Sequence, residues 1–157
     1  MMNRDPVKDI NINSDTKLGD LVEQFGEAGG FVASKVSTAS SIVKDMNSED
    51  CTKFVSFPAD IMATGTRGLM KQIVENDMVD VVVTTCGTLD HDIARVLADY
   101  YHGDFAMDDE LLRDEGVNRL GNVLVPDESY GIPIERWMQP ILEELYGEKK
   151  HWEPWEI

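Results

Sequence analysis

The feature that most constrains the fold is a β-branched run, Val79-Asp80-Val81-Val82-Val83, which continues through Thr84-Thr85-Cys86-Gly87 into a stretch with helical spacing. Such a run is typical of a strand buried in a parallel sheet. A shorter strand signal at residues 53–57 precedes it and ends at Pro58. Apolar residues at helical spacing follow each strand. This strand–helix–strand–helix order predicts an α/β fold, a Rossmann-like parallel sheet with flanking helices.

The rest of the chain is predicted to add helices around this unit. Apolar residues spaced three and four positions apart predict amphipathic helices at 18–25, 32–46 and 134–145. A short helix at 108–113 and a third strand at 122–125 are also expected.

Several single residues are expected to set the boundaries of these elements. Asp60 is a candidate N-cap for the helix after the first strand, and glycines at 26, 29 and 30 are expected to break the first helix. The polar residues 1–15 are interpreted as an extended arm ahead of a single domain at 16–157.

Composition narrows the possible function classes. Fourteen Lys and Arg against thirty Asp and Glu give a formal net charge of −16, which repels a phosphate backbone and argues against nucleic-acid binding as the main activity. Two cysteines are too few for a disulfide framework. The amino terminus lacks the apolar segment of a signal peptide, and no apolar run is long enough to span a bilayer. A cytoplasmic protein without membrane contact is therefore expected.

The first candidate site is the turn Thr85-Cys86-Gly87, where a parallel strand passes into a helix. Ligands of open α/β sheets bind outside the carboxyl ends of such strands, and a helix amino terminus favours a phosphate. The glycine-rich dinucleotide fingerprint and the P-loop are both absent from the sequence. An ordinary strand–helix turn accounts for the same three residues, and spacing alone favours that interpretation.

The second candidate site is Asp90-His91-Asp92, in the first turn of the following helix. The two carboxylates can hold a cationic substrate, and His91 can move a proton near neutral pH. Acidic residues in a first helical turn also simply complement the helix dipole. A metal site is disfavoured because the three histidines are scattered and no CxxC spacing occurs.

Cys86 is a further candidate, as a nucleophile with a lowered pKa at a helix amino terminus. A phosphatase-like loop would need an arginine six positions later, where this chain has Asp92. A small packing residue is the simpler interpretation of Cys86.

Several of these segments resemble the deoxyhypusine synthase family. The resemblance rests on residues 78–87 with Asp90-His91-Asp92, on Gly103-Asp104-Phe105, and most specifically on the block Gly116-Val117-Asn118-Arg119-Leu120-Gly121-Asn122-Val123-Leu124-Val125-Pro126. The segment Phe25-Gly26-Glu27-Ala28-Gly29-Gly30-Phe31 fits as well, so the resemblance covers essentially the whole chain.

The resemblance implies a Rossmann-like fold in a tetrameric enzyme. The family uses NAD to oxidise spermidine, forms an imine with an active-site lysine, and passes the aminobutyl group to a lysine of the hypusine-containing translation initiation factor. By position, the resemblance implies that NAD contacts Ala59, Asp60 and Ala63 on one turn and Thr85, Cys86 and Gly87 on a second. It places Asp90 and His91 near the polyamine and the nicotinamide.

This chain departs from the family pattern in two places. Well-studied members carry Ser-Asn where this chain has Ala59-Asp60, so a negative charge lies close to a pyrophosphate. They also carry paired glutamates where this chain has Asp90-His91. The Asp-His-Asp form resembles a prokaryotic branch, for which a polyamine such as putrescine is an alternative acceptor, as in homospermidine synthesis.

The resemblance also implies a missing carboxy-terminal half, which in the family holds the catalytic lysine and much of the NAD pocket. The surroundings of Lys149 and Lys150 do not match the family's lysine motif. We therefore expect no catalytic residue here, and expect an amino-terminal part or split subunit that is active only with its second half. A non-catalytic partner subunit is the alternative, and an independent hydrolase using Cys86 is a third.

Overall fold

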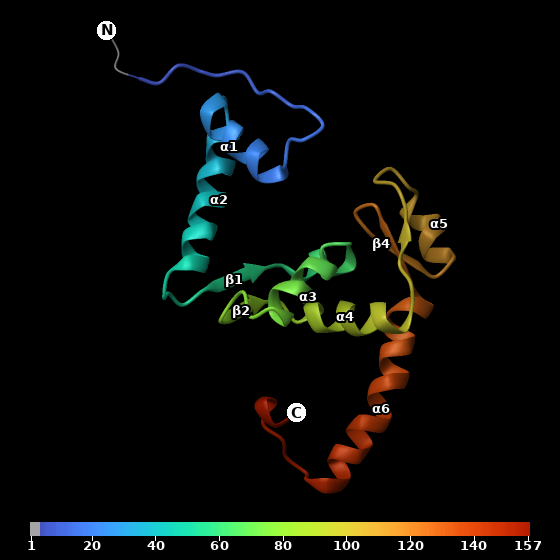
Figure 1. The fold of residues 1–157 in the computed structure, drawn as a ribbon. Coiled ribbons are helices and arrows are strands. Elements are labelled where there is room, and N and C mark those ends of the chain that lie inside the picture. Colours follow the sequence, from blue (N-terminus) through green and yellow to red (C-terminus); the bar gives the residue numbers. More distant parts are fainter. Residues whose placement is uncertain (1–3) are drawn as a thin grey trace. The chain divides into compact units, whose positions relative to one another are not determined.

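The structure is a computed structural model that describes residues 4–157, so the first three residues of the expected arm lie outside it. The chain divides into two compact units, Met1–Lys53 and Phe54–Ile157. Figure 1 labels helices and strands of both units.

The first unit is a helical hairpin of α1 (Leu18–Ala28) and α2 (Ala33–Ser48), which confirms both predicted helices. Gly29, at a φ of 65°, ends α1 as expected, but Gly26 lies inside the helix and does not break it. A Cβ atom at Gly26 would come 2.7 Å from Ser37 Oγ of α2, so this glycine permits the close approach of the two helices. The preceding segment is held along α1 by polar contacts of Lys8 and Asn11.

The second unit contains the predicted parallel pair (Figure 1). Strands β1 (Phe54–Phe57) and β2 (Val81–Thr84) pair in parallel, with Phe57 opposite Thr84. Helix α3 (Arg67–Glu75) connects them, and α4 (Gly87–Leu97) follows β2, which confirms the α/β class. The carboxyl ends of both strands therefore lie at one edge. The sheet is sparsely covered, since Val82 and Val83 are 41% and 52% exposed.

The segment after β1 differs from the prediction. Residues Ala59–Ala63 form a short 3-10 helix, η1, with Asp60 inside it, so Asp60 does not cap α3. Arg95 of α4 keeps η1 from continuing into α3, because its Nη1 donates to the backbone oxygens of Met62 and Thr64. In a continuous helix those carbonyl groups would accept bonds from the next turn.

The predicted third strand belongs to a separate antiparallel sheet of order β3-β5-β4. Its strands are β3 (Tyr101–His102), β4 (Val117–Leu120) and β5 (Val123–Pro126). A tight turn with Gly121 at a φ of 63° joins β4 to β5. The predicted short helix is α5 (Asp109–Asp114), capped by the side chain of Asp108.

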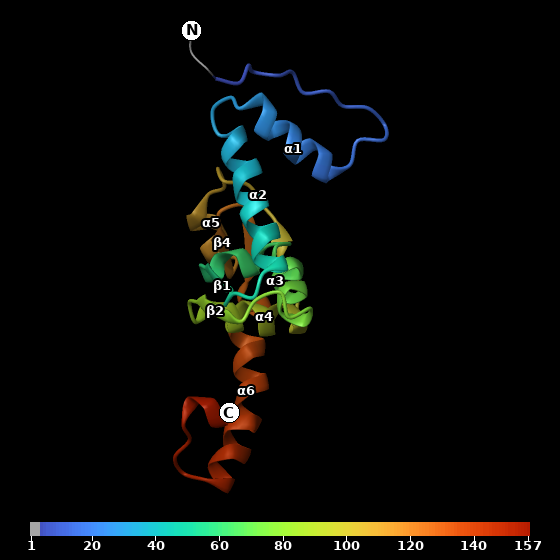
Figure 2. The same ribbon diagram turned by 60° about the vertical axis from the view of Figure 1, so that its left-hand side comes forward.

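A long terminal helix confirms the last prediction and extends it at both ends. After η2 (Asp127–Ser129), α6 covers Gly131–Glu148, and Figure 2 shows it projecting away from the parallel pair. The tail folds back on it through η3 (Pro154–Glu156), because Trp152 Nε1 donates to Leu145 O and Lys149 O at 2.9 Å each. Within residues 4–157, no helix is both long and apolar enough to cross a membrane.

Candidate functional site

The carboxyl edge of the parallel pair brings the two predicted turns together. The backbone N–H of Ala59, at the start of η1, donates to Thr85 Oγ1 at 3.0 Å. Thr84 Oγ1 donates to the backbone oxygen of Phe57 at 2.8 Å, which ties the ends of the two strands. The turn after β1 and the turn after β2 therefore form one continuous edge.

Small residues allow η1 to pack directly on α4. Ala59 is 6% exposed, and Ala63 and Ala94 are also buried. A Cβ atom at Gly87 would lie only 3.1 Å from the Cβ of Ala59. The glycine is thus required by close packing between the two elements, a reason independent of any ligand. Ala59 directs its side chain into this contact and Ala63 is buried, so neither methyl group is available to a ligand.

Polar donors remain free at the start of α4. The side chain of Cys86, the N-cap residue, makes no capping bond. Within residues 4–157, the backbone N–H groups of Cys86 and Gly87 donate to no protein atom. Thr85 accepts from Ala59 and keeps its own hydroxyl proton. These exposed donors at a helix amino terminus suit a phosphate or another polar group of a nucleotide.

His91 lies within an aromatic and acidic cluster one turn further along α4. Its Nδ1 is 2.9 Å from the hydroxyl of Tyr100, and the two rings meet edge to face. The ring of Tyr130 lies against His91 with a centroid distance of 5.1 Å. The Tyr130 hydroxyl in turn donates to Asp90 Oδ2 at 3.3 Å. The two predicted substrate residues, Asp90 and His91, are thereby linked through one tyrosine.

Burial shifts the protonation of this cluster toward its neutral forms. Partial burial lowers the pKa of His91, although the charges of Asp90 and Asp60 oppose the shift. Burial, with the nearby Tyr130 and Asp90, raises the pKa of Tyr100 to about 12. Burial and Asp90 raise the pKa of Tyr130 as well. His91 is therefore neutral at neutral pH, and both tyrosines keep their protons.

Two arginines fix the position of α4. Arg95 bonds the carbonyl groups of η1 and lies 5.9 Å from the centroid of the Tyr100 ring. Arg67 of α3 pairs with Asp92 at 2.6 Å. Asp92 is thus occupied by a structural ion pair, whereas the carboxylate of Asp90 faces Tyr130 and His91.

The structure places the eight predicted residues on η1, on the turn that faces it and on the first two turns of α4. Ala59, Asp60 and Ala63 lie on η1, Thr85 to Gly87 on the facing turn, and Asp90 and His91 on the next turn of α4. Sequence reasoning missed the contributions of Tyr100, Tyr130 and Arg95. The pair Tyr100-Tyr101, shortly after α4, could have drawn attention to Tyr100. No pattern in the sequence marks Tyr130.

Comparison with known proteins settles the family. The sequence profile of deoxyhypusine synthase matches residues 20–157. The chain belongs to the deoxyhypusine synthase family. A probable deoxyhypusine synthase of Picrophilus torridus is 54% identical over 154 residues, which is 98% of this chain and 50% of that protein. One of Thermoplasma acidophilum is 58% identical over 147 residues, which is 94% of this chain and 47% of that protein.

The chain spans about half the length of these curated relatives of the deoxyhypusine synthase family. Among solved structures, that of a candidate deoxyhypusine synthase from Entamoeba histolytica matches with a TM-score of 0.46 and 22% identity. The match covers 69% of this chain and 44% of the Entamoeba histolytica chain.

The block that carries the resemblance to deoxyhypusine synthase is the β4–β5 hairpin. Arg119 donates to both carboxylate oxygens of Asp109 at 2.6 and 2.7 Å and to Gly121 O at 2.9 Å. Asn118 Nδ2 donates to Asp127 Oδ1 at 2.7 Å. The side chains of this block therefore hold the hairpin to α5 and η2, a structural role.

Proposed function

We propose that this chain is the amino-terminal part, or a split subunit, of a deoxyhypusine synthase. The reaction is the NAD-dependent transfer of the aminobutyl group of spermidine to a lysine of the hypusine-containing translation initiation factor. The observation that carries the proposal is the family match over residues 20–157, and its support is a fold that brings the turn after β1 and the turn after β2 together.

The donors around the start of α4 fit part of an NAD molecule. We assign the N–H groups of Cys86 and Gly87 and the hydroxyl of Thr85 to its polar oxygens. The carboxylate of Asp60 is an acceptor, which suits ribose hydroxyl groups better than a pyrophosphate. NAD held there would supply the hydride acceptor for oxidation of spermidine at an amine-bearing carbon.

Asp90 is assigned to the polyamine. It is half-buried beside the neutral His91, and within residues 4–157 its side chain accepts a bond from one hydroxyl, that of Tyr130. Its remaining lone pairs are free for an ammonium group. A hydrogen bond to a charged group in such a position contributes about 1.5–3 kcal/mol.

The catalytic lysine is assigned to the other half of the relatives' length, on this or a second chain. Lys149 is paired with Glu156 at 2.6 Å, and Lys150 lies over the ring of Tyr146 at 3.4 Å, both on the outer end of α6. Neither is close to α4 in the chain, and both serve the fold of the tail.

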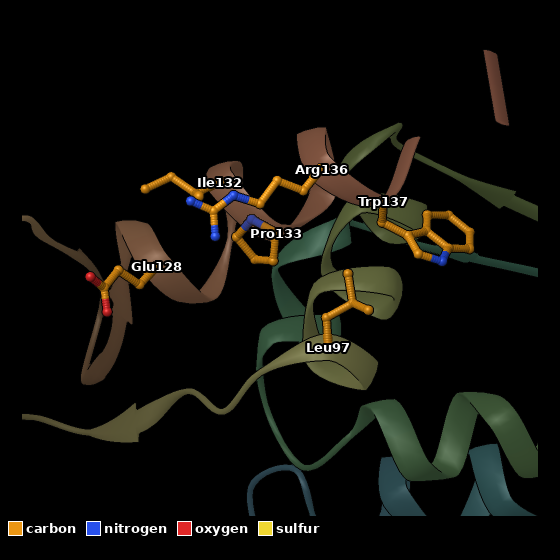
Figure 3. Close-up of a pocket in the computed structure, with 6 residues that line it drawn as sticks. All are labelled: Leu97, Glu128, Ile132, Pro133, Arg136 and Trp137. Carbon is orange, nitrogen blue, oxygen red and sulfur yellow. The ribbon is translucent and has the colours of Figure 1, made fainter. Parts of the chain in front are cut away.

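We further propose that this other half docks at an open hollow of about 590 Å³ between the end of α4 and the start of α6. Figure 3 shows Leu97 and Trp137 facing this hollow from the two helices, with Pro133 of α6 to one side of them. Trp137 is 44% exposed. Relatives about twice as long as this chain supply the occupant. We expect the tetramer-type assembly that the family resemblance implies to use exposed apolar faces of the same kind.

Two alternative functions use the same fold. Ala59 and Asp60 weaken the turn for a pyrophosphate, which favours a non-catalytic subunit that activates a complete paralogue. The histidine at position 91 favours a homospermidine synthase-like enzyme with a polyamine acceptor. NAD binding therefore distinguishes the proposed enzyme from the non-catalytic subunit. The acceptor of the aminobutyl group distinguishes it from the homospermidine synthase-like enzyme.

The test uses the chain in complex with its carboxy-terminal half. Spermidine and NAD binding are measured by calorimetry, and aminobutyl transfer is followed to the initiation factor or to putrescine. Asp90→Asn is expected to weaken spermidine binding by about 10- to 100-fold, the equivalent of one hydrogen bond to a charged group.

Asp92→Asn is the matched control for Asp90→Asn, because it removes a carboxylate two residues away that is already paired with Arg67. Its spermidine affinity is expected to stay within about twofold of wild type. A complex that binds spermidine but not NAD would instead support the non-catalytic subunit. Equal losses in both variants would remove Asp90 from the polyamine site.

A further inference from the structure

We propose that Tyr100 and Tyr130 are positioning residues that hold His91 as the Nε2–H tautomer, so that this N–H is offered to a hydrogen-bond acceptor of the ligand. The identity of that ligand rests on the proposed function. The tautomer itself does not, because it is a property of the protein without ligand.

The first step is the bond between His91 and Tyr100. The two atoms, Nδ1 and the hydroxyl oxygen, are 2.9 Å apart. Within residues 4–157, the Tyr100 hydroxyl has no other hydrogen-bond partner. Of the two possible bonds, O–H···Nδ1 is the stronger, because a phenol hydroxyl is a better donor than a neutral imidazole N–H and an imidazole nitrogen is a better acceptor than a phenol oxygen. The hydroxyl therefore donates to Nδ1, and the imidazole proton sits on Nε2.

The second step is the fixed orientation of the imidazole ring. Tyr100 meets His91 edge to face at 86°, and Tyr130 covers another side of it at an interplanar angle of 34°. The Tyr130 ring is itself held by the bond from its hydroxyl to Asp90. Rotation of the imidazole by half a turn would exchange Nδ1 and Cδ2 and break the bond to Tyr100.

The third step is the position of Nε2, on the edge of the imidazole ring that makes no bond to Tyr100. Cδ2, which is bonded to Nε2, lies 3.9 Å from where a Cβ atom on Gly87 would be. Within the described chain, Nε2 makes no hydrogen bond, yet no buried side-chain nitrogen or oxygen lacks a partner. Nε2 is therefore accessible, on the side of the ring that faces the start of α4.

The charged groups around His91 are compatible with a neutral ring. Asp90 and Arg95 lie on its own helix, Asp60 on η1, and the tyrosines come from the segments before β3 and α6. The two carboxylates favour a cation, whereas burial and Arg95 favour the neutral form, and the neutral form prevails. Both tyrosines keep their protons, so each acts as a donor to its partner.

This arrangement suits the neighbouring residues Asp90 and His91 to different groups of the ligands. A neutral imidazole with its proton on Nε2 cannot accept a bond from an ammonium group, so His91 is unsuited to the amines of spermidine. It suits an oxygen acceptor, such as a ribose oxygen or the carboxamide oxygen of nicotinamide. Asp90 takes the cation. We therefore assign His91 to the cofactor and not to the polyamine.

The experiment is nitrogen NMR of histidine-labelled protein, purified in its native assembly. The imidazole nitrogens report directly which atom carries the proton, and His91→Gln identifies the His91 signals among the three histidines of the chain. Tyr100→Phe removes the bonding hydroxyl and keeps the ring. Tyr130→Phe is the matched control, since it removes a hydroxyl from the other ring that packs on His91 but does not bond it.

In wild type the Nε2–H tautomer is expected to dominate. In Tyr100→Phe its excess over the Nδ1–H tautomer falls by about 2- to 10-fold, the equivalent of one neutral hydrogen bond, and in Tyr130→Phe it is unchanged. Addition of NAD shifts the Nε2 signal, and addition of spermidine does not. A dominant Nδ1–H tautomer, or equal responses of the two variants, overturns the proposal. No response of any signal to either ligand refutes the proposed function alone.

Discussion

The contact between Gly87 and Ala59 gives a prediction that can be worked out in detail. In Gly87→Ala, the new methyl group would lie 3.1 Å from the Cβ of Ala59, closer than ordinary van der Waals contact. Both carbons are fixed directly to backbone, and Ala59 is 6% exposed, so neither can rotate away. Helix α4 and η1 must therefore separate by a few tenths of an ångström.

Two effects of this substitution oppose each other. Overpacking a tight contact costs about 1–3 kcal/mol. Replacing glycine by alanine in a helix contributes at most about 1 kcal/mol, and less at a first helical residue. We therefore expect Gly87→Ala to lower the free energy of unfolding by about 1 kcal/mol, equivalent to a fall in Tm of about 2–4 °C for a chain of this size.

A double-mutant cycle separates this contact from other causes. Ala59→Gly alone removes a buried methyl group and costs about 1–2 kcal/mol. In the double variant the clash is absent, so the two effects are expected to be less than additive by about 1 kcal/mol in thermal or urea unfolding. Strict additivity, or a Gly87→Ala variant more stable than wild type, would refute the packing argument.

Three further predictions concern other residues of the second unit. Arg95→Met leaves two carbonyl groups at the end of η1, those of Met62 and Thr64, without this donor, so the free energy of unfolding measured in urea is expected to fall by about 2 kcal/mol. The lowered pKa of His91 means that, just below pH 6.5, the folded state binds fewer protons than the unfolded state. The contribution of His91 to the free energy of unfolding is therefore complete above pH 6.5 and declines as the pH falls below it. His91→Gln is expected to reduce this slope in urea unfolding measured as a function of pH. Trp137→Ala is expected to weaken assembly with the other half of the enzyme in native mass spectrometry, whereas Leu142→Ala, equally exposed on α6 but outside the hollow, should not.

Much of the fold was predictable because its signals are local. The valine run of β2 and the apolar stripes of α1, α2, α4 and α6 depend on spacing within a few residues. The antiparallel sheet was missed because its strands are short and one of them, β4, carries the polar pair Asn118-Arg119. The turn at Gly121-Asn122 was the available signal for a hairpin.

The candidate site was predictable only in part, for a different physical reason. The turn after β2 follows from parallel strand order, because ligands gather at the carboxyl ends of such strands. The partners of His91 do not follow from it. Tyr130 is 39 positions away and reaches His91 only because α4 packs beside the start of α6. The 3-10 turn of η1 likewise depends on Arg95, which no local pattern around Asp60 reveals.

The two sheets of the second unit also differ in how quickly they can form. The β4–β5 hairpin closes over a tight turn, and hairpins of this kind form in about 1–10 μs. Strands β1 and β2 must first bring together the ends of residues 58–80, with η1 and α3 in between, and such non-local pairing is slower. We therefore expect the segment by which this family is most readily recognised to form early, and the edge that holds the candidate site to be completed after it.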